Sequence, residues 1–206
     1  MTQSVARLKL SLSHWLGIAY LIIAVATYEL LNHVGRDHLI DISLPIDRQI
    51  PVLPIFVIPY LSFIPILFVV VPVILWKRPE DFKRFGLVVL VTQMILNVLY
   101  LVVPATLVRP ELAGSDPFTV LLRDLVWKLD EPINTFPSNH VALSVVAILT
   151  LGFISGWQKY WALQVWLLLV CASTLFVHQH VVLDVIGGFV CGGVVALLAQ
   201  RLRVVR

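Results

Sequence analysis

Charged side chains are scarce in this sequence. Asp, Glu, Lys and Arg make up 13% of the 206 residues, whereas hydrophobic residues make up 59% and the mean hydropathy is +0.94. A soluble domain of this size carries about twice that fraction of charge. The composition therefore excludes an ordinary soluble domain and predicts an integral membrane protein.

Cysteine is also scarce, and Cys171 and Cys191 both fall inside predicted helices. They do not have the spacing of metal ligands, so we expect buried free thiols rather than a disulfide. The sequence has no clear internal repeat, no low-complexity tract and no basic patch suited to nucleic acid. It also shows no carboxylate cluster suited to a divalent ion, so we expect no metal and no other cofactor.

Long apolar segments, by contrast, are abundant. Six are long enough to cross a bilayer as helices, which takes about 20 residues each. They lie at roughly 13–33, 52–76, 85–106, 138–156, 159–178 and 181–199. The first is too long for a signal peptide and no clean cleavage site follows it, so we count it as a spanning helix. We predict an all-α bundle of six transmembrane helices, forming a single integral membrane domain over residues 1–206.

The basic residues are distributed unevenly between the loops. Ten of the fifteen lie before the first helix, around the second and fourth loops, or after the last helix: Arg7, Lys9, Lys77, Arg78, Lys83, Arg84, Lys159, Arg201, Arg203 and Arg206. By the positive-inside rule, both termini are cytoplasmic. We therefore expect a protein of the bacterial inner (plasma) membrane whose net charge of +3 reflects topology and not nucleic-acid binding.

The third loop, from about 107 to 137, contains the amphipathic segment PFTVLLRDLVWKLDEP. One helical face carries its apolar residues and the opposite face its charged ones: Phe118, Leu121, Leu122, Leu125 and Leu129 against Arg123, Asp124 and Lys128. We expect this helix to lie flat at the membrane interface, anchored by Trp127. It would serve as a strut, or as a lid or the wall of a lipid access path.

The last predicted helix has a face of small residues, Gly187, Gly188, Gly192 and Gly193, that includes a G-x-x-x-G spacing. Such a face lets another helix approach closely. We expect it to pack against a helix of the same chain, with a homodimer through this face as the alternative.

Polar residues from separate segments converge on the outer end of this bundle. His180 and Asp184 are four residues apart at a helix start, so they point to the same face. A carboxylate beside an imidazole fixes its tautomer and stabilises the imidazolium, which leaves the other nitrogen free to attack. His140 begins a different helix and could donate and accept a proton.

The same end could hold a phosphate group. The helix that begins at Ser138 offers free backbone N–H groups and a positive dipole end, and Arg109 adds a planar cationic fork. We interpret this combination as machinery for phosphoryl transfer through a phosphohistidine. We expect His14, His33 and His38 to be packed, hydrogen-bonded residues, and His178 is a weaker candidate for a phosphate contact.

Three motifs resemble the signatures of the type-2 phosphatidic acid phosphatase superfamily. Arg109–Pro110, PSNH at 137–140 and STLFVHQHVVLD at 173–184 correspond in order to K-x6-R-P, P-S-G-H and S-R-x5-H-x3-D. The resemblance covers nearly the whole chain. It implies a metal-independent reaction in which His180 attacks phosphorus, Asp184 orients His180, and His140 protonates the leaving oxygen. Arg109 and Ser138 match phosphate-binding positions.

The sequence departs from these signatures at three positions. Val102 stands where the family has a lysine, Thr174 replaces an arginine, and Asn139 replaces a glycine. We keep Asn139 and Thr174 as candidate phosphate-binding residues. The loss of two cations would weaken the binding of a phosphate monoester dianion more than that of a singly charged phosphodiester. The inositolphosphorylceramide and sphingomyelin synthases keep the His-His-Asp core with altered arginine signatures, and this chain resembles them in that respect.

Three functions follow from these observations. The leading hypothesis is a membrane phosphohydrolase that removes phosphate from a lipid phosphate or diphosphate, with the active site on the periplasmic side. The alternative is a lipid phosphotransferase that moves a phospho-headgroup to a lipid hydroxyl. The third, of a different class, is a non-enzymatic transporter of an anion or lipid. The expected partners are a membrane lipid phosphate and the lipid bilayer.

Overall fold

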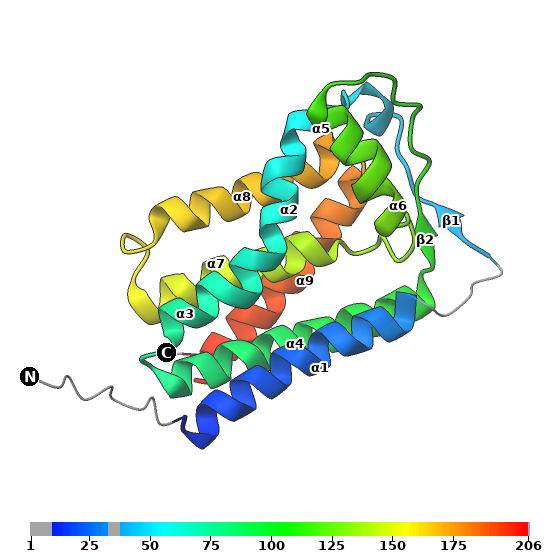
Figure 1. The fold of residues 1–206 in the computed structure, drawn as a ribbon. Helices are drawn as coiled ribbons and strands as arrows, with labels where there is room; N and C mark the ends of the chain where they lie inside the picture. The colour runs from blue at the N-terminus through cyan, green and yellow to red at the C-terminus, as the bar shows by residue number, and fades with distance from the viewer. Residues whose placement is uncertain (1–9, 33–37, 206) are drawn as a thin grey trace, which may run out of the picture.

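The computed structural model describes residues 10–32 and 38–205, and these are mostly helical (Figure 1). His33 and the basic residues Arg7, Lys9, Arg36 and Arg206 lie outside the described residues. The long helices are α1 (Leu12–Asn32), α4 (Pro79–Val102), α7 (Asn139–Ser155), α8 (Trp161–Phe176) and α9 (Val182–Arg201). A further helical segment, Pro54–Leu75, consists of η2 (Pro54–Phe56), α2 (Val57–Pro65), η3 (Ile66–Val70) and α3 (Val71–Leu75).

Each of the six predicted segments corresponds to one of these helical stretches. Four of them, α1, Pro54–Leu75, α4 and α9, are long and apolar enough to cross a membrane. The other two, α7 and α8, are apolar but have only 17 and 16 residues. The all-helical class is therefore confirmed, and the count of six spanning helices stays a prediction.

The segment Pro54–Leu75 changes helix type where its prolines fall. A proline lacks the N–H group needed for a helical hydrogen bond, and its ring crowds the preceding turn. The α-helical geometry of α2 ends at Pro65, and the next five residues, η3, are π-helical. The chain then returns to α-helix in α3, with Pro72 in its first turn. Local changes of this kind accommodate prolines in a helix that packs among neighbours.

Close helix pairs build the bundle, and glycines make them possible. Helix α1 packs along α4, where a Cβ atom on Gly86 would lie 2.8 Å from the carbonyl oxygen of Gly17. Helix α9 packs on α7, where a Cβ atom on Gly192 would lie 2.3 Å from the carbonyl oxygen of Ala142, and one on Gly188 would lie 2.8 Å from that of Ser138. The expected close packing on a helix of the same chain is confirmed for Gly188 and Gly192, whereas a Cβ atom on Gly193 would have no neighbour within 4 Å. The homodimer remains an untested prediction.

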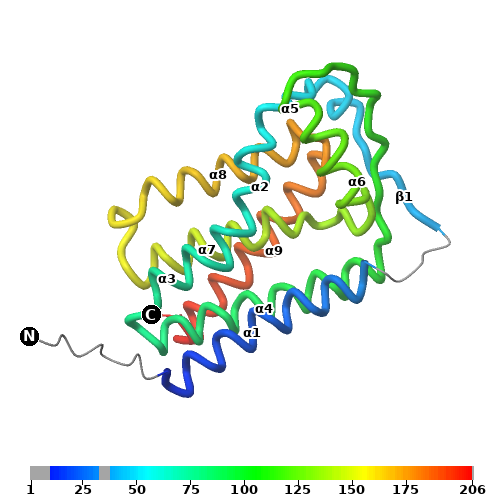
Figure 2. The backbone as a smooth tube through the Cα atoms, viewed as in Figure 1, coloured from blue at the N-terminus to red at the C-terminus, as the bar shows by residue number. Residues whose placement is uncertain are grey.

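Different helix ends and connections lie at the two ends of the bundle. Figure 2 shows the start of α1 and the end of α9 at one end, together with the α3–α4 and α7–α8 connections. We call this the basal end. The opposite end holds the end of α4, the start of α7 and the turn between α8 and α9. We call it the site end.

The loops at the site end are tied together. Strand β1 (Ile40–Asp41) pairs in parallel with β2 (Ala105–Thr106), and Thr106 also bridges to Ile133. The predicted amphipathic segment is helical from Pro117 to Leu129, through α5 (Pro117–Val120), η4 (Leu121–Val126) and α6 (Trp127–Leu129). Leu122 and Val126 are buried against α2 and the end of α8, while Leu125 and Leu129 are exposed. Its placement at a membrane interface stays a prediction.

Cys171, which is buried, and Cys191, which is partly buried, are both free thiols, as expected.

Candidate active site

His180 lies in the turn between α8 and α9, and backbone hydrogen bonds hold this turn. The amides of Gln179 and His180 donate to the carbonyl oxygen of Thr174 at 3.0 and 3.2 Å. His178 adopts a left-handed conformation within the turn, with φ of 50°. These bonds reverse the chain after α8, so that His180 comes directly before α9.

Asp184, in the first turn of α9, orients His180. Its Oδ2 atom accepts the N–H of Val181 at 3.0 Å and lies 3.2 Å from Nδ1 of His180. The carboxylate is fully buried, and the backbone bond fixes it at the helix start. Because Nδ1 faces a carboxylate, we assign the ring proton to Nδ1, which leaves the lone pair on Nε2. Among the described residues, Nε2 has no hydrogen-bond partner.

His140 enters the site from the first turn of α7. Its ring centroid lies 5.8 Å from that of His180, with 62° between the planes. The ring of Tyr60 stacks on His140 at 4.6 Å, and that of Phe63 lies at 4.5 Å. Neither ring nitrogen of His140 hydrogen-bonds to any residue that the structure describes. Aromatic packing therefore positions the ring and leaves its nitrogens available for proton transfer.

The starts of α7 and α9 are joined directly. Ser138 caps α7 by accepting the N–H of Val141 at 3.3 Å, and its own N–H donates to the carbonyl oxygen of Asp184 at 3.0 Å. The hydroxyl of Tyr100, from α4, donates to the carbonyl oxygen of Pro137 at 3.0 Å. Because the two helix starts share a hydrogen bond, the distance between the catalytic candidates is set by backbone.

The first loop covers the α8–α9 turn. Asp47, in η1 (Asp47–Gln49), accepts the N–H of Val182 at 2.8 Å, and Leu53 donates its N–H to the carbonyl oxygen of Phe176 at 2.9 Å. The Nε2 atom of His178 lies 3.0 Å from the carbonyl oxygen of Ile50. His178 is therefore used to hold this loop, and it lines neither of the cavities described below.

Arg109 is engaged by the third loop and the turn. Its guanidinium donates to the carbonyl oxygens of Trp127 at 2.8 Å and Asp130 at 2.5 Å, and to the side chain of Gln179. A weaker bond reaches the carbonyl oxygen of His178 at 3.4 Å. Burial lowers the pKa of Arg109, and the nearby Asp130 raises it again. The group stays charged, as arginine does in proteins, and clamps α6 to the turn.

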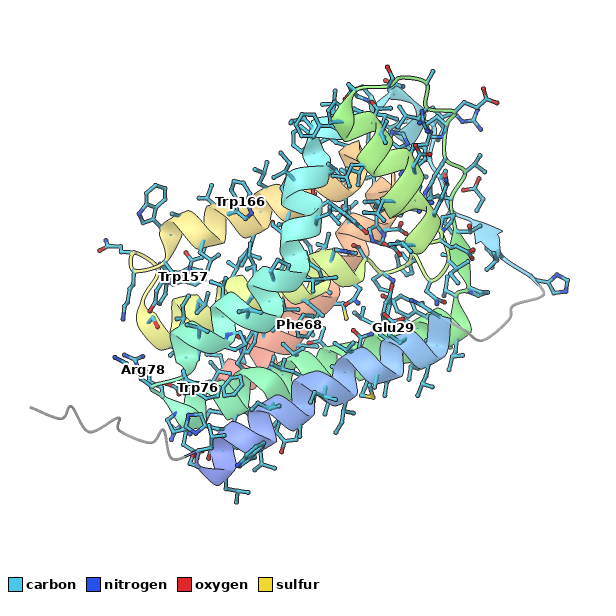
Figure 3. All side chains as sticks on the ribbon, viewed as in Figure 1. Glu29, Phe68, Trp76, Arg78, Trp157 and Trp166 are labelled. Carbon is cyan, nitrogen blue, oxygen red and sulfur yellow. The ribbon has the colours of Figure 1, made fainter. Side chains whose placement is uncertain are left out.

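A large cavity of about 940 Å³ reaches His140 from the basal end. It lies between α1, the segment Pro54–Leu75 and α7, and Figure 3 labels Glu29, Phe68 and Trp76 among its lining residues. Along α1 it extends from Ile18 to Asn32, a rise of about 21 Å at 1.5 Å per residue. Lining residues on both sides are also exposed, so the cavity opens sideways: Ile22 and Val25 on α1, and Ile64, Val69 and Val73 opposite.

A second, small cavity of about 10 Å³ lies beside both histidines. Its lining is mainly polar and comes from the third loop, α1, the start of α7 and the turn. Four residues line both cavities: Tyr28, Asp130, Asn139 and His140. The two cavities therefore adjoin at the start of α7.

The structure brings His140, His180, Asp184 and Asn139 together at the site end. The Oδ1 atom of Asn139 is buried without a hydrogen-bond partner among the described residues. The other candidate phosphate ligands lie outside both linings: Arg109, Ser138 and Thr174. The hydroxyl of Thr174 is buried and donates to the carbonyl oxygen of Cys171 at 2.8 Å. The roles of these residues in binding phosphate stay predictions.

Several residues around the histidines were not identified from the sequence. Asp130 accepts a hydrogen bond from the hydroxyl of Tyr60 and lies 3.4 Å from Nε2 of Gln179. Thr135 and Asn134 line the small cavity. The proximity of Asp130 to the PSNH motif could have suggested Asp130, whereas Tyr60, on an apolar helix, gives no local signal. Val102, where the family has lysine, is 71% exposed and lines neither cavity.

One comparison with known proteins identifies the family of this chain. The family model described as PAP2 superfamily matches residues 84–206, which is more than half of the chain. The chain belongs to this superfamily, and the resemblance drawn from the three motifs is confirmed. The family assignment indicates a phosphatase acting on phosphate esters or a related phosphotransferase. Neither the curated proteins nor the solved structures gave a match.

Proposed function

We propose that this protein is a membrane phosphohydrolase that cleaves a lipid phosphate or diphosphate through a phosphohistidine on His180. The observation that carries the proposal is the pairing at the site end. The Nδ1 atom of His180 faces the buried carboxylate of Asp184 while Nε2 is unengaged, and His140 lies 5.8 Å away between ring centroids. A nucleophile, its orienting acid and a separate proton carrier are what this chemistry requires.

The reaction proceeds in two displacements. The lone pair on Nε2 of His180 attacks phosphorus, the bond from phosphorus to the leaving oxygen breaks, and His140 gives that oxygen its proton. Asp184 stabilises the positive charge that develops on the ring of His180. Water then attacks phosphorus, its proton passes to His140, and the phosphorus–nitrogen bond breaks with the electron pair returning to Nε2. Both histidines end in their starting states.

The start of α7 is the main support for phosphate binding. The backbone N–H groups of Asn139 and His140 have no acceptor among the described residues, and they lie at the positive end of a 17-residue helix. Arg109 would contribute to phosphate binding in one of two ways. It would give up a hydrogen bond to one of its protein acceptors and donate to the phosphate instead, or it would attract the phosphate by its charge at longer range. Ser138 would act through its cap of the helix.

The large cavity supports a lipid substrate. It is mostly apolar, opens sideways between α1 and Pro54–Leu75, and ends at His140. A hydrocarbon chain lying in it would place an attached phosphate at the site end. The loops carrying Lys77, Arg78 and Lys159 lie at the basal end, which supports a cytoplasmic basal end and a periplasmic site.

A reaction without metal is part of the proposal. The residues that the structure describes contain no group of three or more His, Cys, Asp or Glu side chains placed to hold a metal ion. We expect turnover to persist in excess chelator. Loss of activity that returned on addition of magnesium would contradict this part of the proposal.

A lipid phosphotransferase is the second candidate, and the charge of the site favours it. The linings of the two cavities include the carboxylates of Glu29, Asp130 and Glu131 and no lysine or arginine. Such a site suits a singly charged phosphodiester better than a monoester dianion. In this case a lipid hydroxyl, rather than water, would resolve the phosphohistidine.

Labelled lipids test these functions together. Purified protein in nanodiscs would receive phosphatidic acid, phosphatidylglycerol phosphate, a polyprenyl diphosphate or a phosphodiester lipid, and both free phosphate and new phospholipids would be measured. The hydrolase predicts free phosphate, and the transferase predicts a new phospholipid. His180→Ala should abolish either product while the protein stays folded. Lipid or anion flux that persists in His180→Ala without turnover would instead support a transporter.

A further inference from the structure

We propose that the small cavity beside His140 and His180 is the binding site of the water molecule that resolves the phosphohistidine. Thr135 and Asn134 are then positioning residues for this water. The inference rests on the proposed function, and it identifies water rather than a lipid hydroxyl as the acceptor. It adds residues from the third loop to the catalytic site.

The size of the small cavity selects its occupant. At about 10 Å³ it has room for about one water molecule and no more. The large cavity, at about 940 Å³, is where a lipid hydroxyl would have to approach. Both histidines line the small cavity, whereas only His140 lines the large one. Of the two cavities, the one that reaches both histidines is therefore the water-sized one.

Unsatisfied polar atoms supply the partners that such a water needs. Thr135 is 2% exposed and Asn134 is 3% exposed, and both line the small cavity. The Oγ1 atom of Thr135 and the Oδ1 atom of Asn134 are buried with no hydrogen-bond partner among the described residues, and so is Oδ1 of Asn139. Buried polar atoms without partners are rare, because each costs free energy. A bound water makes about three hydrogen bonds, which these atoms can provide.

The chemistry of these atoms also sets the orientation of the water. The amide oxygens of Asn134 and Asn139 only accept hydrogen bonds, so one of them accepts a hydrogen bond from one O–H group of the water, which keeps that proton. His140 takes the other proton as base. Thr135 can donate its hydroxyl hydrogen to the water oxygen, which keeps one lone pair for phosphorus on His180. The amide nitrogen of Asn134 is held by Oδ1 of Asn32 at 2.8 Å, which fixes the orientation of that amide.

In this step one bond to phosphorus forms and one breaks. The water oxygen forms a bond to phosphorus, and the bond from phosphorus to Nε2 of His180 breaks with the electron pair returning to nitrogen. One water proton passes to His140, and the product leaves as phosphate with the remaining proton. The proton on His140 is then available for the leaving oxygen of the next substrate.

Substitution of Thr135 separates the second half of the reaction from the first. Thr135→Val keeps the shape of the side chain and removes the hydroxyl. We expect release of the first product at the normal rate in a single burst, followed by turnover slowed by about tenfold. Phosphohistidine should accumulate and be detected as an acid-labile label on the protein. Thr119→Val, at a threonine that is equally buried but lies outside both cavities, should change neither rate.

Competition between water and small alcohols tests the size of the cavity. Wild-type protein in methanol should release phosphate with little methyl phosphate, and glycerol should give none. Thr135→Gly enlarges the cavity and should raise the methyl phosphate share several-fold. This readout is a ratio of products, so partial loss of folded protein does not alter it.

Three outcomes would overturn the inference. The first is equal partition between water and alcohol in wild type and Thr135→Gly. The second is equal slowing of burst and steady state in Thr135→Val. The third is a wild-type enzyme that transfers the group to a lipid hydroxyl in preference to water. These results leave phosphohistidine chemistry intact, whereas an absence of turnover in wild type with every lipid would count against the proposed function itself.

Discussion

Two histidine clusters lie at opposite ends of this bundle, and they use the same side chain differently. At the basal end, His14 of α1 is 8% exposed and packs against Trp76 at 4.7 Å between ring centroids. Its Nδ1 accepts from the backbone N–H of Ser11 at 3.1 Å, and its Nε2 lies 2.9 Å from the carbonyl oxygen of Trp76. At the site end, His180 and His140 are also packed against rings or a carboxylate, yet they keep nitrogens without partners among the described residues.

The difference between the clusters lies in unused hydrogen-bonding capacity. The bonds of His14 assign its proton to Nε2 and its lone pair to Nδ1, so both ring nitrogens are already used in hydrogen bonds. In His180 the assignment is reversed, since the proton on Nδ1 faces Asp184 and the lone pair on Nε2 is available. Burial alone therefore does not mark a catalytic histidine. What separates His180 from His14 is a ring nitrogen without a partner among the described residues, in a side chain that lines a cavity. The expectation of a packed, hydrogen-bonded role for His14 is confirmed by its bonds.

Replacing one histidine from each end gives the largest expected contrast. His180→Gln removes the proposed nucleophile, so turnover should fall by about 10⁴-fold or more. His14→Gln removes packing and hydrogen bonds and should lower stability by about 1–3 kcal/mol, with turnover per folded molecule unchanged. The measurements are labelled-product release and thermal unfolding of the same preparations. Comparable loss of turnover in both variants would break the contrast between the two ends.

Asp184 distinguishes His180 from His14, since among the described residues no carboxylate forms an ion pair with His14. Asp184→Asn keeps an acceptor for the N–H of Val181 but cannot stabilise the imidazolium of His180. Turnover should fall by about 10²–10⁴-fold with little change in unfolding temperature. Asp124→Asn, at a partly exposed ion pair with Arg123, is the matched control and should behave as wild type. Turnover of Asp184→Asn within a few-fold of wild type would remove Asp184 from the mechanism.

The pH dependence of turnover should depend on the histidines at the site end and not on His14. The proposed reaction needs His180 without a proton on Nε2, so that it can attack, and His140 with a proton to give the leaving oxygen. The rate should therefore follow a bell-shaped curve, falling by about tenfold per pH unit beyond each limb. His14→Gln should leave both limbs in place. A flat profile with chemistry as the slow step would contradict the opposite protonation states of the two histidines.

The smallest effect concerns the loop over the turn. Asp47→Ala removes the acceptor for the N–H groups of Val182 and Leu44, at 2.8 and 2.6 Å. We expect a loss of about 0.5–2 kcal/mol in stability and a decrease of a few-fold in turnover, since α9 starts less firmly. Asp41→Ala, at an exposed residue whose side chain accepts hydrogen bonds from Ser43 in its own loop, should change little. Identical behaviour of the two variants would show that the first loop does not support the site.

Part of this molecule could be predicted because the information is local. The apolar runs correspond to the observed helical segments, and the four-residue spacing of His180 and Asp184 places both on one side of a helix start. The PSNH motif places His140 two residues beyond the helix cap Ser138. Each of these features depends on helix geometry over a few residues, so the sequence pattern carries it completely.

Other parts of the site depend on contacts between distant segments. Tyr60 stacks on His140 from a helix eighty positions earlier, and Asp47 caps a helix that begins at residue 182. The engagement of Arg109 by four acceptors and the burial of the Thr174 hydroxyl against Cys171 also arise only when α6, α8 and the turn pack together. No spacing rule connects residues so far apart.

By itself, the sequence determined the apolar helical segments and singled out two histidines and an acid as candidate site residues, because hydrophobic length and helical period act locally. Only the tertiary structure decided which of these groups face each other, and it enclosed a water-sized polar cavity beside them. The physical reason is that a cavity and a free lone pair are products of packing. They form only where several helices and loops that are far apart in the sequence pack around the same space.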